Sequence, residues 1–168
     1  MIAALGNADM YVSLAGAGRP ADEILKEQLE TQPESIRNAS DIIIDSLKAG
    51  NTVKKVSSLL FSLFRPSVQP YLISWFKYDP SKEISKLKIP ILIIQGTADI
   101  QVSTEDSDLL YKASQGSKLI VIENMNHIFR IVKGDKQENI ATYNDATLPL
   151  ADELVKSIVS FVNNKTRN

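Results

Sequence analysis

The sequence predicts an α/β fold with about three parallel strands, flanking helices and a long helical insertion. Short apolar runs at Ile91–Ile94 and Leu119–Ile122 are bounded by Pro90, Gly96 and Gly116. Runs of this kind are typical of parallel strands that are buried on both faces of a sheet. Because a helical pattern separates the two runs, we expect a strand, helix, strand unit.

A further strand is expected near the start of the chain, at Met10–Leu14, where Tyr, Val and Leu suit a buried strand. The segment that follows, from about residue 19 to residue 87, is far longer than a single crossover between parallel strands requires. We therefore expect one domain over residues 1–168 that contains a helical insertion.

Helix signals divide the insertion into several helices. Pro20 and Pro33 each stand where a helix with one apolar face begins. A third helix is expected at Thr52–Phe64, because its apolar residues recur at helical spacing. Asp79-Pro80 then turns the chain toward a short helix before the second strand.

Between the second and third strands, Ser103 and Asp106 have the spacing of a capping box, with Asp in place of Glu. The helix that they open is expected to end at Gly116. We expect Asp106 and Asp108 to serve only the start of this helix.

The end of the chain is expected to form a core helix at Leu148–Val162, because apolar residues recur there at helical spacing after Pro149. The polar loop 131–147 follows His127 closely. It is expected to lie at the surface beside the ends of the strands.

Asp99 and His127 each come just after one of the expected strands. The loops that follow parallel strands emerge at the same edge of a sheet, so the two side chains can meet there. A carboxylate that accepts from one ring nitrogen of a histidine fixes its tautomer and leaves the other nitrogen free to take a proton. The pair therefore predicts acid–base chemistry, and we expect the two side chains within hydrogen-bonding distance.

Two motifs around these residues resemble a known family. Gly96–Val102 has the pattern G-T-x-D-x-x-V, and 28 residues after Asp99 comes the histidine of Asn124–His127. Both motifs are similar to the last third of an α/β-hydrolase, most closely the serine-aminopeptidase-like and lipase-like enzymes with a helical lid. This resemblance implies that Asp99 is the acid and His127 the base of a Ser-His-Asp triad.

The nucleophile of such enzymes lies on a Gly-x-Ser-x-Gly turn, and the sequence contains no such motif. Met1–Leu5 instead resembles the end of the helix behind that turn, and Gly6 the residue that stops it. We therefore expect a chain that begins after the nucleophile, without the oxyanion-hole loop or the first five strands, and that has no turnover by itself.

The resemblance also implies a substrate pocket under the lid, for which aromatic residues of the insertion are candidates. These are Phe61, Phe64, Tyr71, Trp75 and Phe76. The alternative is that the rings only pack the helices of the insertion together.

Composition excludes several other classes. A net charge of −1 and scattered lysines argue against a nucleic-acid partner, and no apolar run approaches the length of a membrane span. The chain has no cysteine and one histidine, so we expect no metal site and no cofactor. The compartment stays open, because a chain without cysteine suits either redox environment, and the cytoplasm is slightly favoured.

Three hypotheses follow. In the first, the chain is the carboxy-terminal part of a serine hydrolase that acts on a small ester or a peptide-like bond. In the second, it is a non-catalytic module that forms a homo-oligomer through an exposed sheet edge near Met1–Leu14. In the third, it is a complete small enzyme whose nucleophile is another serine, such as Ser13 or Ser103.

Overall fold

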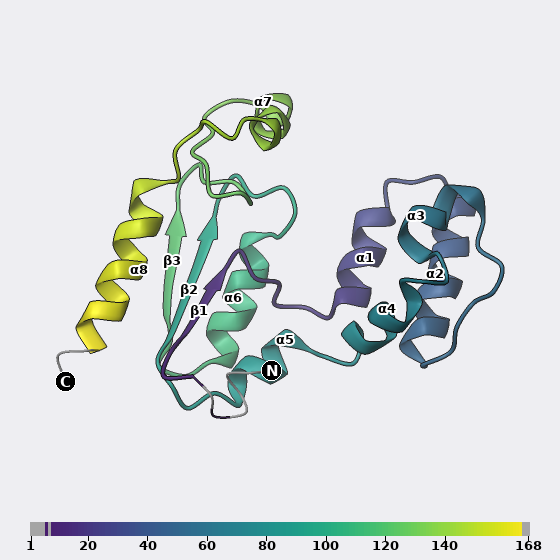
Figure 1. Cartoon of the computed structure of the whole chain (residues 1–168), viewed down its shortest axis with the longest axis horizontal. Helices are drawn as coiled ribbons and strands as arrows, with labels where there is room; N and C mark the ends of the chain where they lie inside the picture. Colours follow the sequence, from purple (N-terminus) through teal and green to yellow (C-terminus); the bar gives the residue numbers. More distant parts are fainter. Residues whose placement is uncertain (1–5, 7, 166–168) are drawn as a thin grey trace. The chain divides into compact units, whose positions relative to one another are not determined.

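The computed structural model describes residue 6 and residues 8–165, so the expected helix end at Met1–Leu5 lies outside the described residues. The chain forms two compact units. Residues up to Gly18 together with those from Ser81 onward make the sheet unit, and Arg19–Pro80 makes the helical unit (Figure 1). None of the helices in the described residues is long and apolar enough to cross a membrane.

The sheet consists of β1 (Tyr11–Leu14), β2 (Ile91–Gly96) and β3 (Lys118–Ile122). The strands are parallel and lie in the order β1-β2-β3, which confirms the predicted arrangement. β2 lies in the centre and all of its residues are buried, because its apolar side chains face a helix on either side of the sheet.

Alternation along β2 builds two apolar cores. Ile91 and Ile93 face α6 (Thr104–Ala113) and pack with its Leu110. Leu92 and Ile94 face the opposite side, where they pack with Leu154 of α8. α8 spans Asp152–Lys165, a few residues later than the sequence predicts. The short helix α5 (Pro80–Ser85) adds Ile84 to the α6 side.

Asp106 does more than the sequence analysis expects. Its side chain is fully buried, and its Oδ1 accepts a hydrogen bond from the backbone N–H of Gly18 at 3.0 Å. Gly18 approaches so closely that an added Cβ would lie 2.2 Å from the Asp106 carbonyl oxygen. Asp106 therefore ties the segment after β1 to helix α6, and the expectation that it serves only the helix start is wrong.

The polar loop 131–147 contains a helix that the sequence analysis did not predict. α7 spans Lys136–Ala141 and continues into a 3₁₀ turn at Thr142–Asn144. Asp135 caps α7, because its side chain accepts from the backbone N–H groups of residues 137 and 138.

The helical unit contains α1 (Ala21–Leu29), α2 (Glu34–Lys48), a 3₁₀ turn at Ser58–Leu60, α3 (Phe61–Phe64) and α4 (Gln69–Trp75). The first two helices start after Pro20 and Pro33, as predicted. The unit has an apolar core of its own, in which Ile44, Leu47 and Phe64 are fully buried.

The helix expected at Thr52–Phe64 begins only at Ser58. The buried amide of Gln69 explains the difference, because its Oε1 accepts from the Val53 N–H and its Nε2 donates to the Val53 carbonyl, both at 2.8 Å. These bonds hold Val53 outside a helix, while its side chain still packs against the core. The helical spacing of the apolar residues before Ser58 therefore reflects their burial against the core and does not indicate a helix.

Candidate active site

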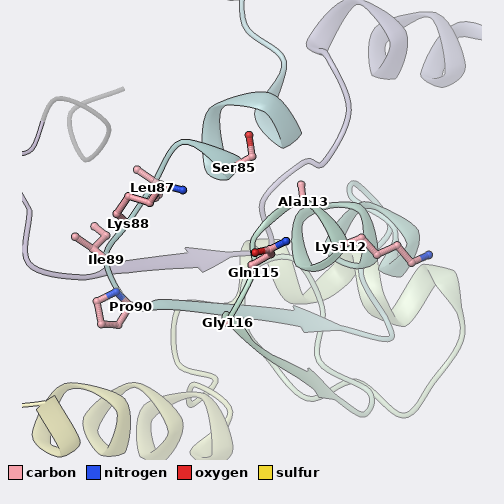
Figure 2. Close-up of a pocket in the computed structure, with 9 residues that line it drawn as sticks. All are labelled: Ser85, Leu87, Lys88, Ile89, Pro90, Lys112, Ala113, Gln115 and Gly116. Atoms are coloured by element: carbon pink, nitrogen blue, oxygen red, sulfur yellow. The ribbon is translucent and has the colours of Figure 1, made fainter.

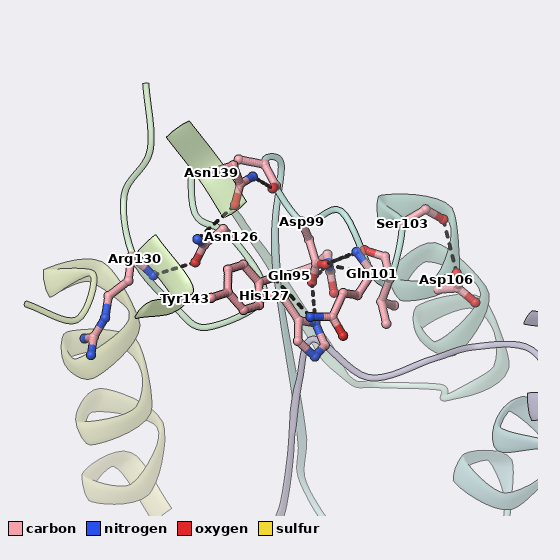
Figure 3. Close-up of polar contacts among 12 residues, drawn as sticks. Gln95, Asp99, Gln101, Ser103, Asp106, Asn126, His127, Arg130, Asn139 and Tyr143 are labelled. Atoms are coloured by element: carbon pink, nitrogen blue, oxygen red, sulfur yellow. Dashed lines mark hydrogen bonds and ion pairs between the residues drawn. The ribbon is translucent and has the colours of Figure 1, made fainter. Parts of the chain in front are cut away.

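Asp99 and His127 meet at the carboxyl edge of the sheet. Asp99 lies in the loop after β2 and His127 in the loop after β3, and the His127 Nδ1 lies 3.0 Å from the Asp99 Oδ2 (Figure 3). The predicted contact between the two side chains is confirmed.

The Asp99 carboxylate is buried and held in place by several donors. Its side chain is 1% exposed, and its Oδ1 accepts from the backbone N–H groups of Gln101 at 2.8 Å and Val102 at 3.0 Å. Its Oδ2 accepts from the Gln95 Nε2 at 3.0 Å in addition to facing His127. Bonds of this kind fix the orientation of a carboxylate.

This arrangement sets the tautomer of His127. An ionised carboxylate only accepts hydrogen bonds, so Nδ1 carries the proton that points to Asp99 and Nε2 carries the lone pair. The His127 side chain is 29% exposed. Figure 3 shows the second ring nitrogen pointing away from Asp99. The pair can therefore accept a proton at Nε2 from a donor outside it.

The two loops approach each other closely at Gly96. A Cβ at this position would lie 1.9 Å from the carbonyl oxygen of Met125. The same oxygen accepts from the Ala98 N–H at 3.0 Å. Sequence reasoning placed Gly96 at the end of a strand, and the structure adds that only glycine fits between the strand and the loop that carries His127.

Sequence reasoning missed three other groups at this edge. Gln95 is fully buried beneath Asp99, and Asn126 and Asn139 are buried beside His127. A buried polar residue at the end of an apolar strand was the signal for Gln95. No comparable signal exists for Asn139, since it lies in a polar loop.

The structure also places the two alternative nucleophiles, Ser13 and Ser103. Ser13 is buried within β1, and the Ser103 Oγ donates to Asp106 at 3.1 Å. In the part of the chain that the structure describes, no serine hydroxyl is hydrogen-bonded to the ring of His127.

The aromatic candidates divide into two groups. Phe64 and Phe76 are buried in the core of the helical unit, where they have the packing role that the sequence left open as the alternative. Tyr71 and Trp75 are 63% and 45% exposed, and their ring centroids lie 5.7 Å apart. Phe61 is also half-exposed.

A cavity of about 750 Å³ lies at the other end of the sheet, where the segments that lead into β2 and β3 meet (Figure 2). It is lined by Ser85, Leu87, Lys88, Ile89, Pro90, Lys112, Ala113, Gln115 and Gly116. Because Asp99 and His127 lie beyond the opposite ends of these strands, this cavity is not part of their site. Within residues 6 and 8–165, no cluster of acidic, histidine or cysteine side chains is arranged to hold a metal ion.

Comparison with curated proteins finds esterase EstD of Thermotoga maritima, which is 25% identical over 155 residues. The match covers 84% of this chain and 34% of EstD, so the chain spans about a third of the length of this relative. No protein-family model matches the chain.

Comparison with solved structures finds an enol-lactonase from Burkholderia xenovorans LB400, with a TM-score of 0.45 and 15% identity, over 96% of this chain and 60% of that one. A meta-cleavage product hydrolase from Pseudomonas fluorescens IP01 has a TM-score of 0.46 and 18% identity, over 94% and 56%. A bromoperoxidase from Bacillus anthracis has a TM-score of 0.39 and 21% identity, over 84% and 42%.

The parallel sheet with its flanking helices and the sequence similarity to EstD agree with the two motifs around Asp99 and His127. The chain has a partial α/β-hydrolase fold and resembles the carboxy-terminal part of such proteins.

Proposed function

We propose that this chain supplies the acid and the base of a serine hydrolase that cleaves an ester or a peptide-like bond by acyl transfer. The observation that carries the proposal is the 3.0 Å contact between a buried Asp99 carboxylate and a half-buried His127 ring whose second nitrogen is available. The similarity to an esterase supports the same reaction class.

In this proposal the nucleophile is a serine on a Gly-x-Ser-x-Gly turn, which the 168 residues do not contain. The Nε2 of His127 takes the proton of the serine hydroxyl as its oxygen bonds to the carbonyl carbon. Asp99 stabilises the imidazolium that forms. His127 then returns the proton to the leaving alcohol or amine, and the same steps with water release the acid.

The 168-residue polypeptide alone is expected to have no serine-hydrolase turnover, because its sequence contains no Gly-x-Ser-x-Gly nucleophile turn. A fluorophosphonate probe and a p-nitrophenyl ester test this. We expect no labelled serine and no ester hydrolysis that depends on His127. Stoichiometric serine labelling that disappears in His127→Ala would show instead a complete enzyme with a nucleophile such as Ser13.

The coding sequence upstream of Met1 provides the positive test. If it encodes an in-frame Gly-x-Ser-x-Gly after a strand, the longer protein should hydrolyse p-nitrophenyl esters. His127→Ala should then lower kcat by roughly 10⁶-fold, as loss of a triad base does. Equal activity in the variant and the parent would refute the base role.

The helical unit is the proposed lid of this hydrolase. Tyr71 and Trp75 remain the proposed substrate-binding residues, because their rings are exposed whereas Phe64 and Phe76 are enclosed in the core. In the longer protein, Trp75→Ala should raise KM more than it lowers kcat, since a pocket wall binds the substrate and its transition state alike.

The second candidate function is self-association through β1. Among the described residues this strand is a sheet edge. Tyr11 and Ala15 donate to carbonyls at Pro90 and Ile94, so the alternate N–H groups, at Val12 and Leu14, face away from β2. An edge of this kind invites pairing with a second copy.

Val12→Pro tests this second candidate, because it removes an outward N–H that the sheet itself does not use. We expect a dimer or larger assembly by light scattering at micromolar concentration, and a monomer for the variant. Val12→Thr keeps the N–H and should stay associated. A parent chain that is monomeric at these concentrations would end this proposal.

A further inference from the structure

A buried amide bridge joins the two loops that carry the acid and the base. Asn139, on α7, is 4% exposed, and its Nδ2 donates to the carbonyl of Ala98 at 2.6 Å. Its Oδ1 accepts from the Asn126 Nδ2 at 3.1 Å. Ala98 directly precedes Asp99 and Asn126 directly precedes His127, so one side chain holds the residue before each member of the pair (Figure 3).

Asn126 is in turn held on all sides. It is fully buried, its Oδ1 accepts from the Arg130 N–H at 2.9 Å, and its Nδ2 also donates to the Thr142 Oγ1 at 2.8 Å. The Thr142 hydroxyl donates to the Asn139 carbonyl at 2.7 Å. Every polar atom of the Asn126 side chain is therefore paired, which fixes the backbone from which the His127 ring extends.

We propose that Asn139 is a positioning residue that sets the separation of Asp99 and His127 through this bridge. The inference rests on the proposed function, because the separation of Asp99 and His127 affects catalysis only if the two act as an acid–base pair. Helix α7 then has a role in the site, although none of its residues belongs to the acid–base pair. Through Asn139 it helps to hold the loops after β2 and β3, which carry Asp99 and His127.

The physical reason is that Asn139 adds a side-chain link to the backbone contact that already joins the loops, in which the Ala98 N–H donates to the Met125 carbonyl. The Ala98 carbonyl precedes the turn at Asp99, and a buried polar group that loses its hydrogen-bond partner keeps the cost of its desolvation. Without Asn139, the Asn126 Nδ2 and the Ala98 carbonyl both lose a partner. The two loops should then sample a wider range of separations, and the hydrogen bond between Asp99 and His127 should be made for less of the time.

Nuclear magnetic resonance of the whole chain tests the bridge, because His127 is its only histidine and gives an unambiguous ring signal. The readout is the rate at which the Nδ1 proton exchanges with water. Asn139→Ala should speed this exchange by roughly tenfold or more, as a weakened local structure does. Asn144→Ala is the matched control, since this exposed asparagine ends the same segment, and it should leave the rate unchanged.

If Asn139→Ala does not fold, Asn139→Asp gives the same readout. It keeps the acceptor for Asn126 and the shape of the side chain but loses the donor to Ala98, so faster exchange is again expected. An unchanged exchange rate of the Nδ1 proton in a folded Asn139 variant would refute the proposed positioning role of Asn139.

The proposed function is tested separately in the same spectra. If the parent protein shows an Nδ1 proton that Asp99→Asn abolishes, the acid–base pair stands whatever Asn139 does. If the parent itself carries its proton on Nε2, the pair fails before the bridge is considered.

Discussion

The two units of the chain use their buried polar groups differently. In the helical unit, Gln69 donates to the carbonyls of Val53 and Phe64, and these bonds end within the packing of that unit. In the sheet unit, a comparable set of bonds leads from Gln95 through Asp99 to a ring that is 29% exposed. The hydrogen bonds of Gln69 stay within buried packing and serve the fold. Those of Gln95 and Asp99 lead to a partly exposed ring that can accept a proton, which makes this end of the sheet the candidate functional site.

Each unit also carries its own spectroscopic probe, which makes the comparison testable. Trp75 is the only tryptophan and lies in the helical unit, and His127 is the only histidine and lies in the sheet unit. Since each unit has an apolar core of its own, we expect substitutions in one core to move the unfolding transition of that unit's probe alone.

The largest effect is expected for Gly96→Ala in the sheet unit. The new Cβ would lie 1.9 Å from backbone oxygen of Met125, so the strand and the loop must separate. We expect the free energy of unfolding, followed by the His127 ring signals, to fall by more than about 4 kcal/mol. Gly134→Ala is the control, because its close contacts are with the exposed Glu138 side chain and not with backbone, and it should cost less than about 1 kcal/mol. Similar costs for both would refute the close approach.

The next effect is expected for Leu47→Ala in the helical unit, where this side chain is fully buried. The substitution should lower the free energy of unfolding by about 3 kcal/mol through lost burial and a new cavity. Urea titration followed by Trp75 fluorescence should show the loss. The His127 signals should keep their midpoint, and one shared transition for both probes would show that the units do not unfold separately.

The smallest effect concerns pH. The hydrogen bond that Lys48 donates to the Asp22 carboxylate raises the pKa of Lys48 above its ordinary value of 10.5; burial lowers it, and charge attraction to Asp22 adds to the rise. A raised pKa in the folded state adds stability that is full below pH 10.5 and is lost as the pH rises through the folded value.

The helical unit should therefore lose up to about 1 kcal/mol of stability above that pH, since Lys48 is half-exposed. Asp22→Asn should remove this dependence. Urea unfolding followed by Trp75 fluorescence gives the free energy of unfolding of both proteins at several pH values. The same dependence of this free energy on pH in both proteins would contradict the ion pair.

The sequence predicted the sheet and the meeting of Asp99 with His127 because both depend on a simple rule. Parallel strands bring the loops after them to one edge, so residues 28 positions apart become neighbours. Asp106, Gln69 and Asn139 could not be predicted in this way. Each bonds a backbone group that lies far away or in an irregular segment, and neither spacing nor apolar pattern records such a partner.

The ring tautomer of His127 shows whether Asp99 and His127 form the proposed acid–base pair. In the ¹⁵N spectrum of protein labelled at histidine, near neutral pH, we expect a protonated Nδ1 and an unprotonated Nε2, and Asp99→Asn should abolish this preference. A parent protein whose Nε2 carries the proton would refute the pair, because His127 could not then take a proton from a nucleophile while Asp99 holds its other nitrogen.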